Sequence, residues 1–178
     1  LHRALLASQT VITRTAQDFA QAFGREAGGL VQGYRLEDAE VVMVAMGSIV
    51  GLLKEMADAL REEGVKVGVL KITTFRPFPS EAIRQALGIG AARGARVKTV
   101  AVLEKAVSLG GLGILAAELR SAAHSWPNAP IINGFVAGLG GKDIPPQTIR
   151  NMVEMAQEDY VENHFLDLDE EFTAQHRQ

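Results

Sequence analysis

Residues 41–48, VVMVAMGS, decide the fold class of this 178-residue chain. A continuous apolar run that ends in Gly47-Ser48 predicts a parallel strand, buried on both faces and followed directly by a helix with Ser48 as its N-cap. The apolar stripe of that helix continues through Leu53 to Leu60 and ends at Gly64. Residues 65–72 predict a second strand, so the stretch forms a strand–helix–strand unit.

The same alternation continues along the chain. The pattern predicts a short helix over 80–87, a strand over 98–104, a helix over 112–123 that ends at His124, a strand over 130–137 and a last helix that begins near Pro146. Alternating strands and helices predict an α/β fold with a doubly wound, mostly parallel sheet. Ligands or partners of such sheets meet them at the carboxyl ends of the strands.

Both ends of the chain differ from this pattern. Residues 2–23 carry an apolar stripe through Leu5, Ile12 and Phe19 and predict a helix that stops at Gly24. Residues 25–38 lack periodicity and predict an extended connection. We therefore expect a linker helix and connection over 1–38, the α/β domain over 39–157 and an acidic tail over 158–178.

The composition, 47% hydrophobic and 22% charged, is ordinary for a globular protein. The lack of cysteine excludes disulfides, zinc–thiolate sites, iron–sulfur ligation and thiol catalysis within these residues, and it fits a reducing cytoplasm. The apolar run over 41–53 is interrupted by glycine and serine and is too short for a bilayer span, so we expect no membrane segment. The chain begins with Leu1 rather than Met and has no leader pattern, which suggests a piece of a longer protein.

The charge is unevenly distributed. Residues 158–178 carry seven acidic residues and one basic residue, a net charge of -6, whereas residues 1–157 carry +3. This distribution argues against a nucleic-acid partner, because binding to phosphates rewards clustered Lys and Arg. Tyr160, Phe165, Leu166 and Phe172 alternate with the acids, which predicts a tail that docks on another protein.

Three glycine-rich turns, beginning at Gly47, Gly110 and Gly138, follow predicted strands. Backbone amides in such turns can hold phosphate. The dinucleotide fingerprint is incomplete, however, because Ala45 stands where its first glycine belongs and the second strand ends near Lys71 rather than at an acid. Tight-turn packing is the favoured interpretation, and a nucleotide or coenzyme A site stays as the alternative.

Other catalytic patterns are missing from the sequence. Ser48 and Ser108 do not lie in a nucleophile elbow, and the histidines have no second histidine or cysteine three or four residues away. The acids of residues 167–171 lack the glycine and the spacing of a calcium loop. We therefore expect no catalytic, cofactor-binding or metal-ligating residue in this chain.

Residues 75–79, FRPFP, follow the second strand. The prolines stiffen this turn, and Arg76 adds a fixed positive charge with five hydrogen-bond donors. Arg76 either ties down carbonyl groups in a rigid connection or lies at a subunit interface or substrate channel.

Several segments together resemble a known family. Residues 40–53 (EVVMVAMGSIVGLL), 64–79 (GVKVGVLKITTFRPFP) and 134–143 (GFVAGLGGKD) closely resemble the transketolase C-terminal-like domain of 2-oxoacid:ferredoxin oxidoreductase alpha chains, the pyruvate synthase class. The resemblance implies a parent enzyme that uses thiamine diphosphate, Mg²⁺, coenzyme A and iron–sulfur clusters. That enzyme would convert a 2-oxoacid, pyruvate before 2-oxoglutarate or branched-chain oxoacids, into acyl-CoA, CO₂ and reduced ferredoxin.

The resemblance further implies a structural and interface domain that is inactive alone, because the cofactor-binding domains lie elsewhere. Its expected partners are other subunits or domains of an oligomeric oxidoreductase, and ferredoxin through the holoenzyme. Departures occur at Glu104-Lys105, where the family often has Asp-Arg, and at residues 144–146, where it often has Thr-Pro. A free-standing nucleotide- or coenzyme A-binding module and a protein-binding adaptor are the alternatives. The expected interface residues are Arg76, Glu104, Lys105, Lys142, Tyr160 and Phe165.

Overall fold

The computed structural model describes residues 1–90 and 97–168 and contains a six-stranded sheet. The strands follow the order β1-β3-β2-β4-β5-β6, in which β1 is antiparallel to β3 and every other pair is parallel. This architecture confirms the predicted doubly wound, mostly parallel sheet. The strands are β1 (Val31–Tyr34), β2 (Val41–Ala45), β3 (Val67–Ile72), β4 (Thr99–Glu104), β5 (Ile131–Val136) and β6 (His164–Phe165).

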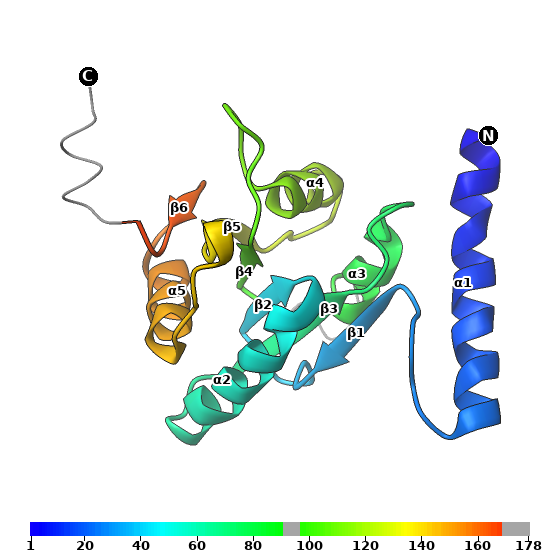
Figure 1. The fold of residues 1–178 in the computed structure, drawn as a ribbon, viewed down its shortest axis with the longest axis horizontal. Helices are drawn as coiled ribbons and strands as arrows, with labels where there is room; N and C mark the ends of the chain where they lie inside the picture. Colours follow the sequence, from blue (N-terminus) through cyan, green and yellow to red (C-terminus); the bar gives the residue numbers. More distant parts are fainter. Residues whose placement is uncertain (91–96, 169–178) are drawn as a thin grey trace.

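Helices cover both faces of the sheet (Figure 1). On one face α2 (Val50–Glu62) and α5 (Pro146–Glu158) enclose a core that includes Met43 and Phe135. On the other face α3 (Ser80–Ala86) and α4 (Ile114–Ala123) enclose a second core that includes Leu70 and Leu119. Every residue of β2 is buried, as its continuous apolar run predicts for a central strand covered on both sides.

The start of α2 differs from the prediction. Ser48 is not the N-cap, because a short 3₁₀ turn, η1 (Gly47–Ile49), comes first and α2 begins at Val50 without a side-chain cap. Gly47 has a φ of 75°, a left-handed conformation that glycine adopts without steric cost. The glycine therefore sets the sharp exit from β2, and the serine lies inside the turn that follows.

Residues 31–34 correct the prediction of an extended connection, because they join the sheet as β1 and pair with β3 from Val31 opposite Ile72 to Tyr34 opposite Val69. Without β1, β3 would be an edge strand with unpaired backbone groups. A Cβ at Gly33 would lie 2.5 Å from Leu36 Cδ1, so a larger residue here would force the Leu36 side chain to shift. The strand is too short, and too interrupted by glycine, to show a period.

The region after α5 is also structured. β6 pairs in parallel with β5, so residues 164 and 165 of the predicted tail form the opposite edge of the sheet. The part of the tail after Leu168, with Phe172, lies outside the described residues.

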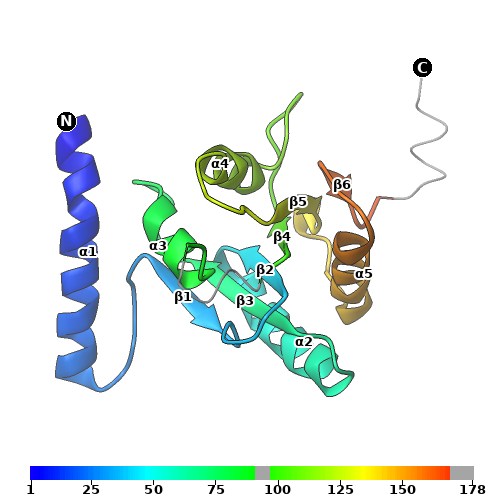
Figure 2. The same ribbon diagram turned by 180° about the vertical axis from the view of Figure 1, so that it is seen from behind.

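The N-terminal helix α1 (His2–Phe23) ends at Gly24 as predicted, with Gly24 in the left-handed conformation. None of its residues is buried, and it stands apart from the sheet on the β1 side (Figures 1 and 2). The Gln9 side chain tethers it by donating a hydrogen bond to the carbonyl oxygen of Phe78, 3.1 Å away. In the described part of the chain, no helix is both long and apolar enough to cross a membrane.

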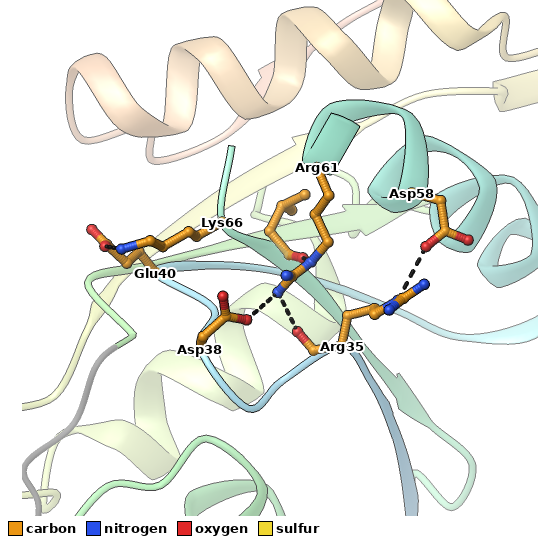
Figure 3. A network of polar contacts seen from close by, with 7 residues as sticks. Arg35, Asp38, Glu40, Asp58, Arg61 and Lys66 are labelled. Carbon is orange, nitrogen blue, oxygen red and sulfur yellow. Dashed lines mark hydrogen bonds and ion pairs between the residues drawn. The ribbon is translucent and has the colours of Figure 1, made fainter. Parts of the chain in front are cut away.

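A polar network joins α2 to the amino-terminal ends of β2 and β3 (Figure 3). Arg61, near the end of α2, donates hydrogen bonds to the Asp38 carboxylate at 2.6 Å, the carbonyl of Arg35 at 2.9 Å and the carbonyl of Val67 at 2.7 Å. The Arg35 guanidinium pairs with Asp58 on α2 at 3.2 Å. These contacts fix the turn between β1 and β2 against the helix.

Glu40, at the edge of this network, predicts a pH dependence of stability. Hydrogen bonds donated by Lys98 and Lys66 lower the pKa of Glu40 from 4.5 to about 2. Because the folded-state pKa is depressed, the ion pairs stabilise the fold above about pH 4.5, and this contribution is lost as the pH falls toward 2. We expect Glu40→Gln to narrow the difference between urea midpoints at pH 6 and pH 3. An unchanged difference would contradict this role.

Candidate functional site

A pocket of about 410 Å³ opens at the carboxyl edge of the sheet. The chain passes from β2 to β3 on one side and then to β4 on the other, so the carboxyl ends of β2 and β4 flank a topological switch point, where open α/β sheets bind ligands. Its lining is mostly apolar and comes from the residues after β2 and β3, from the end of β4 and the residues that follow it, and from the start of α4. The lining residues are Met46, Gly47, Ser48, Ile49, Phe75, Leu103, Glu104, Lys105, Ala106, Ile114 and Leu115.

Glu104 lines this pocket and stabilises α4. Its carboxylate oxygens accept hydrogen bonds from the backbone N–H groups of Leu115 at 2.6 Å and Ala116 at 3.0 Å. A Cβ at Gly113 would lie 2.1 Å from Glu104 Oε2, so this glycine makes room for the carboxylate. Burial raises the pKa of Glu104, and the bonds from the helix amides oppose that shift. The Glu104 carboxylate therefore accepts the hydrogen bonds of backbone N–H groups in the first turn of α4, which have no partner within the helix.

Replacing Glu104 with alanine is expected to lower the free energy of unfolding by about 2 kcal/mol, because two partly buried amides at the start of α4 lose their acceptors. Glu104→Gln keeps one side-chain oxygen as an acceptor, so its free energy of unfolding should fall by less. Urea unfolding checks both variants. Glu55→Ala, an exposed change on α2, is the control and should stay within about 0.5 kcal/mol. Equal losses for Glu104→Ala and Glu55→Ala would contradict this role.

Arg76 lies beside the pocket, and its side chain reaches α4. Its guanidinium donates a 2.5 Å hydrogen bond to the Glu118 carboxylate and lies 4.1 Å from the centre of the Phe75 ring, which lines the pocket. It also donates to the carbonyl of Phe75 at 3.2 Å. These contacts fit the interpretation that Arg76 holds a rigid connection, and they leave half of its side chain exposed at this edge.

Lys105 and Lys142 lie along the same edge. Lys105 forms part of the pocket wall and extends toward the turn at Gly138, where an added Cβ would be 2.7 Å from Lys105 Cε. Lys142 donates a hydrogen bond to the carbonyl oxygen of Asp167, and the Asp167 carboxylate accepts one from the N–H of Gly138 at 2.7 Å. Hydrogen bonds therefore join the residues after β5 and β6, and the Lys105 side chain lies against the turn at Gly138.

The last two expected residues lie elsewhere. Tyr160 is half exposed, with the Arg120 guanidinium 5.7 Å from its ring centre. Phe165 belongs to β6 at the sheet edge and pairs with Val136. The structure thus gathers Arg76, Glu104 and Lys105 at the pocket and Lys142 nearby, and it places Tyr160 and Phe165 on the flank formed by β5 and β6.

The apolar part of the site was not predicted from the sequence. Met46 is 37% exposed and Ile114 is 43% exposed, and both side chains line the pocket. Their positions directly after a predicted strand and at the start of a predicted helix were the available signal.

Each of the three predicted glycine turns has a glycine with positive φ, at Gly47, Gly110 and Gly138, as expected for tight turns.

The chain matches one family model and several known proteins. The family described as "Pyruvate:ferredoxin oxidoreductase core domain II" matches residues 39–149. Pyruvate synthase subunit PorA of Methanosarcina barkeri is 40% identical over 167 residues, which cover 90% of this chain and 40% of that protein. PorA of Thermotoga maritima is 43% identical over 82% of this chain and 35% of that protein. Ketoisovalerate oxidoreductase subunit VorA of Pyrococcus horikoshii is 35% identical over 83% of this chain and 36% of that protein.

A solved structure supports the fold. The 2-oxoglutarate:ferredoxin oxidoreductase of Magnetococcus marinus, determined with 2-oxoglutarate, coenzyme A and succinyl-CoA bound, superimposes with a TM-score of 0.50 at 19% identity over 79% of this chain and 21% of that chain. This chain spans about two fifths of the length of the curated relatives that it matches. Because the family match covers most of the α/β domain, the chain belongs to the pyruvate:ferredoxin oxidoreductase core domain II family.

Proposed function

We propose that this chain is a structural and interface domain of a thiamine-dependent 2-oxoacid:ferredoxin oxidoreductase and has no catalytic activity alone. The observation that carries the proposal is the 40% identity to a pyruvate synthase subunit over 90% of this chain, which corresponds to only 40% of that subunit. Such an enzyme oxidatively decarboxylates a 2-oxoacid to acyl-CoA and reduces ferredoxin. The names of the relatives favour pyruvate as the substrate and keep ketoisovalerate as the alternative.

The geometry of the carboxyl edge supports a structural role. Glu104 is bound to the amides of α4, Arg76 to Glu118, and Lys142 to the carbonyl of Asp167. We place thiamine diphosphate, Mg²⁺ and the iron–sulfur clusters outside this chain. Its described residues contain no group of three or more His, Cys, Asp or Glu side chains that could hold a metal ion.

The apolar mouth of the pocket, with the charges around it, is the surface that we propose for contact with a neighbouring domain or subunit. Arg76 and Lys105 lie on this surface, and Lys142, Tyr160 and Phe165 extend it along β5 and β6. An apolar centre with an Arg side chain at its rim is typical of protein interfaces.

Native mass spectrometry of the tagged endogenous protein tests this function. We expect the chain, or a longer one that contains it, to travel with thiamine diphosphate and with cluster-bearing subunits or domains. The assembly should reduce ferredoxin with pyruvate and coenzyme A, whereas the 178-residue chain alone should not. Turnover by the isolated chain, or a species without partners, would contradict the proposal. Supplying ketoisovalerate in place of pyruvate tests the substrate.

A pair of matched variants tests the interface. Lys105 follows β4 and Lys98 precedes it, so the two lysines lie at opposite ends of one strand. We expect Lys105→Gln to weaken retention of the other subunits at moderate salt and Lys98→Gln to leave it unchanged. Equal retention by the two variants would remove Lys105 from the proposed interface.

A further inference from the structure

Asn133 and Gly134 form the only Asn-Gly pair of the sequence, and they lie in the middle of β5. Both residue types are uncommon inside strands. The pair also has a chemistry of its own, because the backbone nitrogen of the second residue can attack the side-chain amide carbon of the first and form a cyclic imide. Glycine favours this reaction, since it has no Cβ to hinder the attack and its backbone turns freely.

One residue binds both reacting groups. The N–H of Val161 donates a 2.7 Å hydrogen bond to Asn133 Oδ1, and the carbonyl oxygen of Val161 accepts a 2.9 Å hydrogen bond from the N–H of Gly134. The Asn133 amide also donates to the Thr99 hydroxyl at 2.7 Å, and the residue is fully buried. While Val161 stays in place, the attacking nitrogen keeps its proton in a hydrogen bond and the amide is fixed through both of its polar atoms.

Residues 159–163, which we name the β5 latch, contain Val161 and connect α5 to β6 (Figure 1). Arg120 on α4 donates hydrogen bonds to the latch carbonyl oxygens of Val161 at 3.2 Å and Glu162 at 2.6 Å. Asn163 Oδ1 accepts a 3.3 Å hydrogen bond from the backbone N–H that precedes α4. No residue of the latch is buried. A segment held by hydrogen bonds with little apolar burial opens locally at a lower free-energy cost than the core.

We propose that Asn133-Gly134 is a deamidation site that the β5 latch keeps closed. When the latch opens, the Gly134 nitrogen forms a bond to Asn133 Cγ, the bond from Cγ to Nδ2 breaks, and the Gly134 proton leaves with Nδ2 as ammonia. Water then opens the cyclic imide at one of its two carbonyl carbons, which leaves an aspartate or an isoaspartate at position 133. The reaction consumes only water, and hydroxide accelerates it by removing the proton from the Gly134 nitrogen.

The product does not fit the closed latch. Asn133 Nδ2 lies 3.4 Å from the carbonyl oxygen of Ala156, so a carboxylate at this position places a negative oxygen against that carbonyl. A buried ionised group without a partner is strongly unfavourable. Deamidation therefore converts a transient opening of the latch into a permanent one, and β6 and Asp167 lose their anchor beside the sheet. The proposal concerns the chain by itself and does not depend on the function of the assembly.

Peptide mass spectrometry of the full 178-residue chain tests this site, because replacing the amide by a carboxylate raises the mass of the peptide that contains residue 133. At pH 8.5 we expect this residue to deamidate at least about tenfold more slowly in the folded chain than in the chain unfolded in urea, since only the open fraction reacts. The folded rate should rise with pH. Asn151, which precedes Met152, is the internal reference and should react slowly even in urea.

Arg120→Met tests the latch, because it removes the donors to the two latch carbonyls. We expect the deamidation rate of the folded chain to rise by about tenfold or more, the range for lost hydrogen bonds to a charged group. Hydrogen exchange at residues 161–166 should accelerate with it. Arg150→Met is the matched control, since Arg150 on α5 pairs with Glu63 at the end of α2, and it should leave the deamidation rate unchanged. The urea midpoint of each variant verifies that the fold is intact.

Two further variants keep the test decisive. Asn163→Ala removes the contact to the backbone before α4 and loosens the latch without a change in β5 or α4, so it should also accelerate deamidation. Gly134→Ala separates opening from chemistry. Its added Cβ would lie 2.6 Å from the carbonyl oxygen of Glu162, so hydrogen exchange of the latch should be faster, whereas deamidation in urea should be slower because the Cβ hinders the attacking nitrogen.

Four results would overturn the proposal. Equal deamidation rates in the folded and the urea-unfolded chain would show that the latch gives no protection. Faster hydrogen exchange at residues 161–166 in Arg120→Met without faster deamidation would show that opening the latch does not release the pair. Equal acceleration by Arg120→Met and Arg150→Met would assign the reaction to global unfolding. A deamidated chain whose residues 161–166 exchange as slowly as before would show that the latch closes again.

Discussion

Replacing Asn133 with alanine is expected to lower the free energy of unfolding by about 3–4 kcal/mol. Asn133 is fully buried in β5, and its Nδ2 donates a hydrogen bond to the Thr99 hydroxyl at 2.7 Å. Its Oδ1 accepts one from the N–H of Val161 at 2.7 Å. Alanine leaves the N–H of Val161 without its acceptor and creates a cavity between β5 and α5, which together produce the expected loss, whereas the Thr99 hydroxyl keeps its bonds to the carbonyls of Ile131 and Ala156.

Thermal and urea unfolding check this prediction, with an expected decrease in Tm of roughly 10 °C for a domain of this size. Asn151→Ala is the matched control. Asn151 lies exposed on α5 and accepts one hydrogen bond from Gln147, so its loss should change stability by less than about 0.5 kcal/mol. Asn133→Ala with the stability of the control would show that the buried amide contributes nothing.

The central strands and helices could be predicted because the sequence patterns that indicate them are local and repeat along each element. The apolar run of β2 and the amphipathic stripe of α2 each span a complete element. The edge strands gave no such signal. β1 has four residues with a glycine inside, and β6 has two, so both exist through pairing with a neighbouring strand and not through any period of their own.

The charged residues of the candidate site were found, but their roles were not visible in the sequence. Glu104 directly follows a predicted apolar strand, which places it at the carboxyl edge. That its carboxylate binds the amides of Leu115 and Ala116 depends on a contact between two elements and on the space left by Gly113. The apolar lining was missed for a similar reason, since Met46 and Ile114 look like ordinary core residues until their exposure is known.

Asn133 illustrates a signal that was present but unused. A single amide side chain within the apolar run of residues 130–137 indicates a polar contact inside the core, because buried polar groups require partners. The partner, the backbone of Val161, lies 28 residues away in the predicted tail. Sequence alone therefore could not show that the beginning of this tail is anchored to the sheet.

Gly134→Ala is expected to destabilise the chain by about 2–3 kcal/mol through overpacking at the same anchor. An added Cβ would lie 2.6 Å from the carbonyl oxygen of Glu162 and 3.1 Å from Arg120 Nη2, so the backbone of the segment after α5 has to move. That shift also strains the 2.9 Å hydrogen bond from the N–H of Gly134 to the carbonyl of Val161. Urea unfolding measures the loss, and hydrogen exchange should show earlier opening of residues 161–166.

The control substitution, Gly51→Ala, is expected to change stability in the opposite direction to Gly134→Ala. Gly51 lies exposed in α2 and keeps ordinary helical backbone angles, and a Cβ added there would meet no neighbouring atom within 4 Å. Gly51→Ala should therefore stabilise the chain by about 0.5–1 kcal/mol. If both substitutions stabilise, the close approach at Gly134 is not a constraint. If only Gly134→Ala destabilises, the missing side chain in β5 is what allows the segment after α5 to lie against the sheet and carry Asp167 to the carboxyl edge.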